Sequence, residues 1–342
     1  MTITLRADEL SKTYTRKVRQ AGFAAALRAV FSSDVESLHA VSELSFSIER
    51  GERVGLIGEN GAGKSTTLKM LTGILVPSSG RLQVLGLDPW RQRRQLAGQI
   101  GVVFGQRPQL LWDIPVQETL SLLRTMYRIP KDVYDVTYRQ AVERLELGPL
   151  LPVAVRKLSL GQRMRCDLAA SLLHAPAIAF LDEPTIGLDV SVKEQVRQYI
   201  RDMQQRFETT LLLTTHDLKD ITETCDRLLL LDRGKLLFDG SLKDFERRFA
   251  TKRRIVIELE RATTEPARAA LERELRELGA ELQECRGHRV VVCYERDGLA
   301  PVLTQHLLSR LPVTDIVLEK ADIDSMVASI YRRRSDAEGT LT

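Results

Sequence analysis

The chain has 342 residues, a length that favours two domains because a single hydrophobic core stops growing near about 250 to 300 residues. Lys and Arg total 50 and Asp and Glu total 46, and this net charge of +4, mixed over both signs, disfavours a dedicated nucleic-acid binder. An apolar fraction of 43% excludes a largely disordered chain.

No apolar run approaches the roughly 18 residues needed to cross a bilayer, and the first residues lack the apolar core of a secretion signal. We therefore expect the chain to stay in the cytoplasm. Its cysteines form no CxxC pair, so free thiols are expected rather than a zinc site or a disulfide framework. They are Cys166, Cys225, Cys285 and Cys293.

Short apolar runs alternate with longer amphipathic stretches up to about residue 250, the pattern of a parallel sheet flanked by helices. Two early runs, 3–5 and 44–48, alternate polar and apolar residues and predict antiparallel strands with one solvated face. Buried strands are predicted at 53–58, 100–105, 177–182 and 209–215. A hairpin is predicted at 227–239, turning at Arg233 and Gly234.

A charged run at 247–254 separates this block from a tail with a different pattern. From residue 255 we expect strand, helix, strand, strand, helix and strand, and then a last helix from Asp322. This order is the ferredoxin-like split motif, which can fold as a small α+β domain. The predicted small domain spans 254–334, and a flexible tail spans 335–342.

Residues 58–66 read GENGAGKST, a full match to the phosphate-loop pattern, between a predicted strand and a predicted helix. The glycines let successive N–H groups point at phosphate oxygens, and the helix N-terminus adds its partial positive charge. Lys64 can reach the β- and γ-phosphates, and the Ser65 hydroxyl can ligate Mg²⁺. The candidate nucleotide-binding residues in this loop are Gly58, Asn60, Gly61, Gly63, Lys64, Ser65 and Thr66.

Residues 178–184 read IAFLDEP, a strand that delivers Asp182 and Glu183 to its C-terminal end, where ligands bind in open α/β sheets. Such an acidic pair is by itself as easily a solvated turn or a helix cap. Together with the phosphate loop, it predicts that Asp182 helps to hold Mg²⁺ while Glu183 faces a water near the γ-phosphate.

Between these elements, residues 158–162 read LSLGQ and open an amphipathic helix. This segment resembles the signature motif of ATP-binding cassette (ABC) ATPases, and the phosphate loop, signature and acidic strand follow the family's order. Gln106 resembles the Q-loop glutamine, 187–189 the D-loop, and His216 the switch histidine. Tyr14 resembles the aromatic that stacks on adenine. Leu160 departs from the family, which usually has glycine there.

The resemblance covers residues 1–245 and implies an ATPase that closes as a head-to-tail dimer on two ATP. Glu183 would polarise the attacking water, His216 would contact the γ-phosphate, and Gln106 would sense Mg²⁺ and that water. From the opposite chain, ATP would be bound by Ser159, Gly161, Gln162 and Asp189. The implied metal ligands are Ser65, Gln106 and Asp182.

The family fold is a P-loop α/β cassette with a mixed sheet core, an antiparallel β subdomain and a helical subdomain, which we place at 1–246 with the helical part at about 107–175. Residues 16–39 form an expected amphipathic helical insertion with an apolar stripe and basic neighbours. This helix suits a membrane interface, and packing on its own cassette is as plausible. The stripe consists of Phe23, Leu27, Val30 and Phe31.

Residues 105–120 resemble the region that docks the coupling helices of membrane subunits, although Leu110 and Trp112 are equally suited to burial in the cassette. Together with the small tail domain, the chain most resembles ATPase subunits of bacterial multicomponent drug, antibiotic and polysaccharide exporters. That implies a homodimer attached to the cytoplasmic face of the membrane by separate permease subunits, with no nucleic acid.

The alternative is a nutrient importer of the methionine type, because such importers also carry a ferredoxin-like tail. Non-transport cassettes of translation or DNA repair fit less well, since this chain has one cassette and no sustained heptads.

Overall fold

A computed structural model describes residues 2–17, 35–105, 109–249, 253–262, 264–295 and 298–319, together with 323, 326, 327, 330 and 331. The chain divides into two compact units, Met1–Leu242 and Lys243–Thr342. The sequence-based boundary, between a cassette at 1–246 and a small domain at 254–334, lies slightly later.

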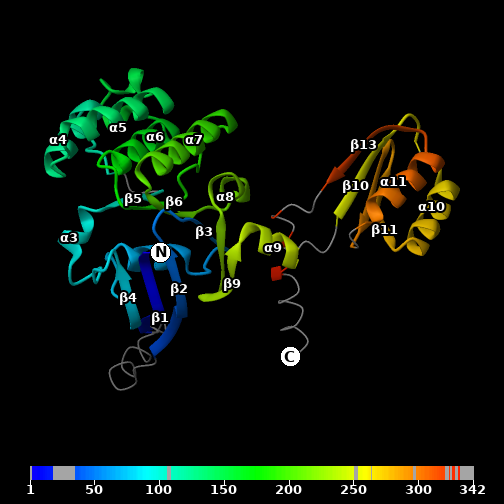
Figure 1. The fold of residues 1–342 in the computed structure, drawn as a ribbon, viewed down its shortest axis with the longest axis horizontal. Helices are drawn as coiled ribbons and strands as arrows, with labels where there is room; N and C mark the ends of the chain where they lie inside the picture. Colours follow the sequence, from blue (N-terminus) through cyan, green and yellow to red (C-terminus); the bar gives the residue numbers. More distant parts are fainter. Residues whose placement is uncertain are drawn as a thin grey trace, which may run out of the picture. The chain divides into compact units, whose positions relative to one another are not determined.

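The central sheet of the first unit has six strands in the order β5-β6-β7-β3-β8-β9 (Figure 1). They are β3 (Arg53–Gly58), β5 (Ile100–Phe104), β6 (Ile178–Asp182), β7 (Thr210–Thr214), β8 (Arg227–Asp232) and β9 (Lys235–Ser241). All neighbours are parallel except the hairpin of β8 and β9. The predicted buried strands and hairpin are therefore confirmed, and the carboxyl ends of the parallel strands meet at one edge.

A second, three-stranded sheet has the order β2-β1-β4 and is antiparallel. Its strands are β1 (Ile3–Lys17), β2 (Val35–Glu49) and β4 (Ser79–Val84), so the predicted runs at 3–5 and 44–48 are parts of much longer strands.

The helix expected at 16–39 is wrong at both ends, because Arg16 pairs with Glu36 and Lys17 with Val35 in the β1–β2 ladder. The strand pairing continues outward to these residues instead of giving way to helix. Residues 18–34, which include the predicted apolar stripe, lie outside the described part of the chain.

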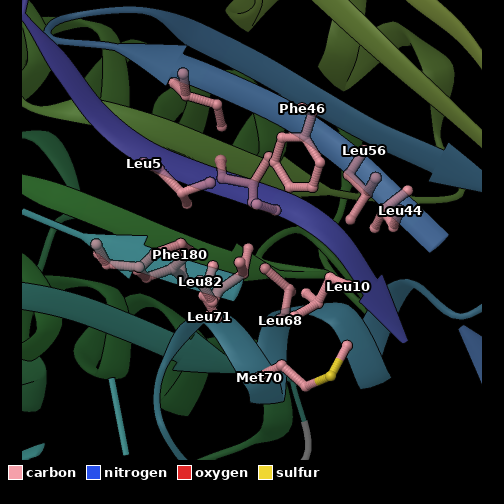
Figure 2. Packing of buried hydrophobic residues seen from close by; sticks show 14 of the residues in the cluster. Leu5, Leu10, Leu44, Phe46, Leu56, Leu68, Met70, Leu71, Leu82 and Phe180 are labelled. Carbon is pink, nitrogen blue, oxygen red and sulfur yellow. The ribbon is translucent and has the colours of Figure 1, made fainter. Parts of the chain in front are cut away.

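The helix that follows the phosphate loop, α2 (Lys64–Leu71), is anchored by a hydrophobic cluster. Leu68 and Leu71 share this cluster with Leu5 and Leu10 of β1 and Phe180 of β6 (Figure 2). All five side chains are fully buried. Because each such leucine contributes about 1.5 to 3 kcal/mol on burial, the cluster fixes α2 firmly between the two sheets.

The helices of the first unit fall into two groups. Besides α2, the central sheet is accompanied by α3 (Arg93–Ala97), α7 (Val190–Phe207) and α8 (Leu218–Thr224). Helices α4 (Val116–Met126), α5 (Lys131–Arg144) and α6 (Leu160–Leu172), with short 3₁₀ turns at Gly148–Leu150 and Val155–Lys157, form the helical part. They fall within the range 107–175 predicted for the helical subdomain.

Helix α9 (Leu242–Phe249) begins at the last residue of the first unit and continues into the second. The second unit also contains β10 (Arg253–Leu259), α10 (Glu265–Glu277), β11 (Ala280–Arg286), β12 (Arg289–Tyr294), α11 (Leu299–Arg310) and β13 (Val313–Glu319). Its antiparallel sheet has the order β11-β12-β10-β13, which confirms the ferredoxin-like fold. The core lies under α10 and α11, where Leu271, Leu275, Leu303 and Leu307 pack on the sheet. Helix α9 was not predicted, and it takes up the first residues of the charged run.

Among the described residues, no helix is both long and apolar enough to span a bilayer. The four cysteines are all described, and none of them forms a disulfide.

Candidate functional site

The phosphate loop runs from the end of β3 to the start of α2, and two of its glycines are fixed by close contacts. A Cβ at Gly58 would lie 2.6 Å from the carbonyl oxygen of Leu231 in β8. Gly63 has a φ of +102°, and a Cβ there would lie 2.5 Å from the carbonyl oxygen of Ala40. Larger residues at either position would push the loop away from the sheets that shape it.

The hairpin turn between β8 and β9 supports the phosphate loop from outside. The amide of Gly234 donates to the carbonyl of Ala62 at 3.0 Å, and the amide of Ser42 in β2 donates to the carbonyl of Gly234 at 2.8 Å. Within the loop, the amide of Ala62 donates to the carbonyl of Glu59 at 3.0 Å and closes a turn. These three hydrogen bonds hold the phosphate loop in shape.

Lys64 begins α2 and folds back over the loop. Its ammonium donates to the carbonyls of Gly58 at 2.5 Å and Glu59 at 3.0 Å. Burial lowers the pKa of Lys64, while the charges of Glu183, Asp182 and Glu59 act in the opposite direction. The lysine therefore lies within the electrostatic field of Asp182 and Glu183.

The other loop candidates sit at the open side of this turn. Ser65 is exposed at the start of α2, and the side chain of Thr66 is half-buried. Asn60 and Gly61 are exposed in the loop itself. Their exposure leaves them accessible to a nucleotide.

Asp182 is the last residue of β6 and lies between two neighbouring strands. It pairs in register with Phe104 of β5 and Thr214 of β7. The hydroxyl of Thr214 donates to its Oδ1 at 2.5 Å, which fixes the orientation of the carboxylate.

Glu183 leaves the strand with a φ of +55°, a conformation that is uncommon for a residue with a side chain. Its amide still donates to the carbonyl of Thr214 at 2.9 Å. Its carboxylate accepts a hydrogen bond of 2.6 Å from Nδ1 of His216, which follows β7. Glu183 is mostly buried and His216 is two-thirds exposed, with side-chain exposures of 22% and 66%. The backbone turn aims the glutamate at the histidine.

The signature segment opens α6 with a complete capping box. The amide of Gln162 donates to Oγ of Ser159 at 3.2 Å, and the amide of Ser159 donates to Oε1 of Gln162 at 3.0 Å. Ser159 is exposed, so the positive end of this helix is open to an anion.

The residue that departs from the family, Leu160, packs on the D-loop. A Cβ at Gly187 would lie 2.9 Å from Cδ2 of Leu160, and one at Gly161 would lie 3.0 Å from Cδ2 of Leu188. Asp189 then precedes α7 as its exposed N-cap. The residues assigned to binding ATP from the opposite chain thus gather on one surface.

Of the remaining candidate residues, Tyr14 is described by the structure and Gln106 is not. Tyr14 lies in β1 opposite Leu38 of β2, is 40% exposed, and has the ammonium of Lys12 at 5.4 Å from its ring centroid. The Tyr14 side chain is therefore partly exposed, with a cation over its ring. Gln106 lies outside the described residues.

Sequence reasoning missed the residues that support the acidic pair. Thr214 orients Asp182, and the buried Asp220 contacts Thr185 and Thr215 on the two loops that carry Glu183 and His216. The available signal was the spacing of Asp220 from His216, which puts it on the first turn of a helix that starts after the switch loop.

The chain is similar to known proteins in both sequence and fold. The family model described as ABC transporter matches residues 41–186. The ABC transporter ATP-binding protein NatA of Bacillus subtilis is 30% identical over 213 residues, which cover 62% of this chain and 86% of that protein. The Nod factor export ATP-binding protein I of Neorhizobium galegae is 36% identical over 200 residues, which cover 58% of this chain and 57% of that protein.

A dimeric ATP-binding cassette, solved in a post-hydrolysis state with ADP and Pi, superposes with a TM-score of 0.57 and 23% identity. The match covers 70% of this chain and 98% of that one, and at this identity it shows the shared fold. The fold, the phosphate loop and the coverage of NatA together establish that the chain belongs to the ATP-binding proteins of ABC transporters, which are ATPases.

Proposed function

We propose that two copies of this chain close head to tail on two ATP, and that hydrolysis drives export through separate membrane subunits. The observation that carries the hydrolytic part is the contact between Glu183 and His216, within the charge field of Lys64. In this arrangement Glu183 orients and deprotonates the attacking water, and His216 holds the glutamate and contacts the γ-phosphate.

The residues near the phosphate loop fit a magnesium ion. Mg²⁺ prefers a few protein oxygens and completes its shell with phosphate and water, and the chain offers the exposed Ser65 hydroxyl and the Asp182 carboxylate. Because Thr214 donates to Oδ1 of Asp182, that carboxylate has a fixed direction. When bound, the ion would neutralise charge that develops on the β- and γ-phosphate oxygens.

The pairing of two copies is supported by the accessible signature surface. Ser159 and the N-terminus of α6 offer hydrogen-bond donors and partial positive charge to an anion. In the proposed dimer this anion is the γ-phosphate of the ATP that is held by Lys64 of the second copy. Leu160 and Gly187 extend the same surface toward Asp189. ATP would then act as a ligand between the two copies.

Docking to membrane subunits is supported by exposed large apolar side chains on and just before α4. Leu111, Trp112, Leu122 and Met126 are 43% to 66% exposed. Of the two residues considered from sequence, Leu110 is buried and Trp112 is half-exposed, so Trp112 is the one available to a partner.

Export is supported by the relatives, one of which carries Nod factor export in its name. The chain would work at the cytoplasmic face of the membrane, held there by its permease partners.

The test is a pull-down of the tagged chain from detergent-solubilised membranes, with mass spectrometry of the co-purifying chains and an assay of vanadate-sensitive ATPase activity. Polytopic membrane chains without a substrate-binding protein are the expected result. A substrate-binding protein in the complex would point to import, and ribosomes or DNA would contradict transport altogether. Trp112→Glu should release the membrane chains while ATP binding persists.

A further inference from the structure

A single buried carboxylate contacts both loops that carry the hydrolytic pair. Asp220, near the start of α8, is 1% exposed. Its Oδ2 accepts hydrogen bonds from the hydroxyls of Thr185, in the loop after Glu183, and of Thr215, which directly precedes His216. The Thr215 contact is 3.2 Å long.

The carboxylate is held from its other side by an equally buried arginine. Nη1 of Arg197, on α7, donates to Oδ1 of Asp220 at 2.9 Å, and Arg197 is 2% exposed. The same guanidinium binds Glu194 at 2.9 Å and Glu223 at 2.8 Å. Because a buried charge must be paired and hydrogen-bonded to persist, this network leaves Asp220 little freedom to move.

Helix α7 also reaches the switch loop by a second route. The ammonium of Lys193 lies 2.6 Å from Oδ2 of Asp217, whose amide donates to the hydroxyl of Thr215 at 3.0 Å. That hydroxyl therefore donates to Asp220 and accepts from Asp217, so its rotation is fixed. Since α7 starts directly after Asp189, the same network ties the D-loop helix to the loop of His216.

We propose that Asp220 is a positioning residue for ATP hydrolysis, which locks the loops after β6 and β7 together through Thr185 and Thr215 and thereby keeps Glu183 against His216. The proposal rests on the catalytic roles assigned above to Glu183 and His216. A displacement of about 1 Å in such a pair can lower a rate by about 10²-fold without touching substrate binding.

The experiment replaces each threonine hydroxyl in the full-length chain. Thr185→Val and Thr215→Val keep the volume and remove the hydrogen bond to Asp220. We expect kcat for ATP to fall by about 10- to 100-fold, while the dissociation constant for trinitrophenyl-ATP changes by less than about twofold, because the phosphate loop is untouched. Thr185→Ser and Thr215→Ser restore the hydroxyl and should recover most of kcat.

The matched control is Thr209→Val. Thr209 is also buried, flanks the other end of β7, and donates its hydroxyl to the carbonyl of Pro176 at 2.8 Å. It should lose thermal stability like the other valine variants and keep its kcat. Asp220→Asn complements the series, with its melting temperature measured alongside.

The outcomes separate this proposal from the one it rests on. If Glu183→Gln abolishes hydrolysis but both threonine-to-valine variants match the Thr209 control, the positioning role is wrong and the assigned catalysis stands. Serine variants as slow as the valine variants, or a parallel loss of nucleotide affinity, would also overturn it. If Glu183→Gln hydrolyses ATP normally, the catalytic assignment itself fails and the positioning role fails with it.

Discussion

The carboxylate of Glu183 and the imidazole of His216 meet at 2.6 Å although they follow two different strands of the central sheet, β6 and β7. The contact exists because β6 and β7 are parallel neighbours, with Asp182 opposite Thr214, so the residues after them emerge side by side. This short hydrogen bond fixes the direction of the Glu183 carboxylate, which is the group proposed above to activate the attacking water.

The first prediction concerns this pair. Glu183→Gln should lower ATP turnover by about 10²-fold or more and leave nucleotide binding intact, because the amide cannot accept the proton of the attacking water. His216→Ala should also be slow, since it frees the glutamate side chain. Steady-state hydrolysis and trinitrophenyl-ATP binding measure the two effects separately.

Because the two side chains are in contact, their effects should not add. The double variant should be scarcely slower than Glu183→Gln alone. A double variant whose loss equals the product of the single losses would show that His216 acts independently of Glu183.

A second prediction concerns Lys64. Replacing it by alanine removes the cation from the loop and should weaken ATP binding by about 10- to 100-fold, the range expected for hydrogen bonds to a charged group. Lys69→Ala is the control, because Lys69 is an exposed cation in the last turn of the same helix. Equal affinities for the two variants, measured by fluorescence titration, would refute the phosphate-loop assignment.

The parts of the fold that the sequence predicts well are encoded locally. β3 begins and ends where its apolar run does, and the hairpin turn has Arg233 and Gly234 both at positive φ. The ferredoxin-like order follows from short alternating strands and helices. In β1 and β2, by contrast, Glu9 and Glu43 adopt positive φ where the register shifts. The polar–apolar alternation breaks at these positions, so the sequence pattern predicts only fragments of the two strands.

The supports of the site depend on pairing that sequence patterns do not contain. Thr214 meets Asp182 only because β6 and β7 are adjacent, and Asp220 reaches Thr185 only after α8 packs against that edge. Similarly, the contact of Leu160 with Gly187 follows from how α6 approaches the D-loop. The motifs therefore identify the candidate nucleotide-binding residues but not the residues that hold them in place.

A third prediction concerns Ser159, which caps α6 and, as proposed, binds the γ-phosphate of the opposite chain. Ser159→Ala removes both functions and should cost about 1 kcal/mol of stability, whereas Ser159→Gly costs only a few tenths because glycine is tolerated at the N-cap. Both variants should fail to dimerise with ATP in the Glu183→Gln background. Size-exclusion chromatography with light scattering measures the dimer. If the glycine variant dimerises normally, the hydroxyl has no role between chains.

The fourth prediction concerns stability against pH and rests on His174, which follows α6. Its ring stacks on Tyr127 with centroids 4.3 Å apart, and Nε2 donates to the carbonyl of Ile100 at 3.1 Å. Burial lowers the pKa of His174 from 6.5 to about 4. Between these values the unfolded chain binds the proton and the folded chain does not, so this contribution to stability is present above pH 6.5 and is lost as the pH falls toward 4.

His174→Gln keeps an amide donor for Ile100 but cannot titrate. Between pH 7 and pH 5 its free energy of unfolding should therefore fall by about 1 to 2 kcal/mol less than that of the wild type.

The effect of pH on stability has the opposite sign at Asp167. Burial raises the pKa of Asp167 from 3.8 to about 6, so its contribution to stability is lost as the pH rises through that value. Asp167→Asn should therefore make the fall in stability on acidification steeper than in the wild type.

Urea denaturation followed by tryptophan fluorescence measures both effects. Both tryptophans, Trp90 and Trp112, lie in the first unit, so their fluorescence reports on the unit that contains His174. Identical pH dependence in the wild type and His174→Gln would show that the histidine titrates normally in the folded chain.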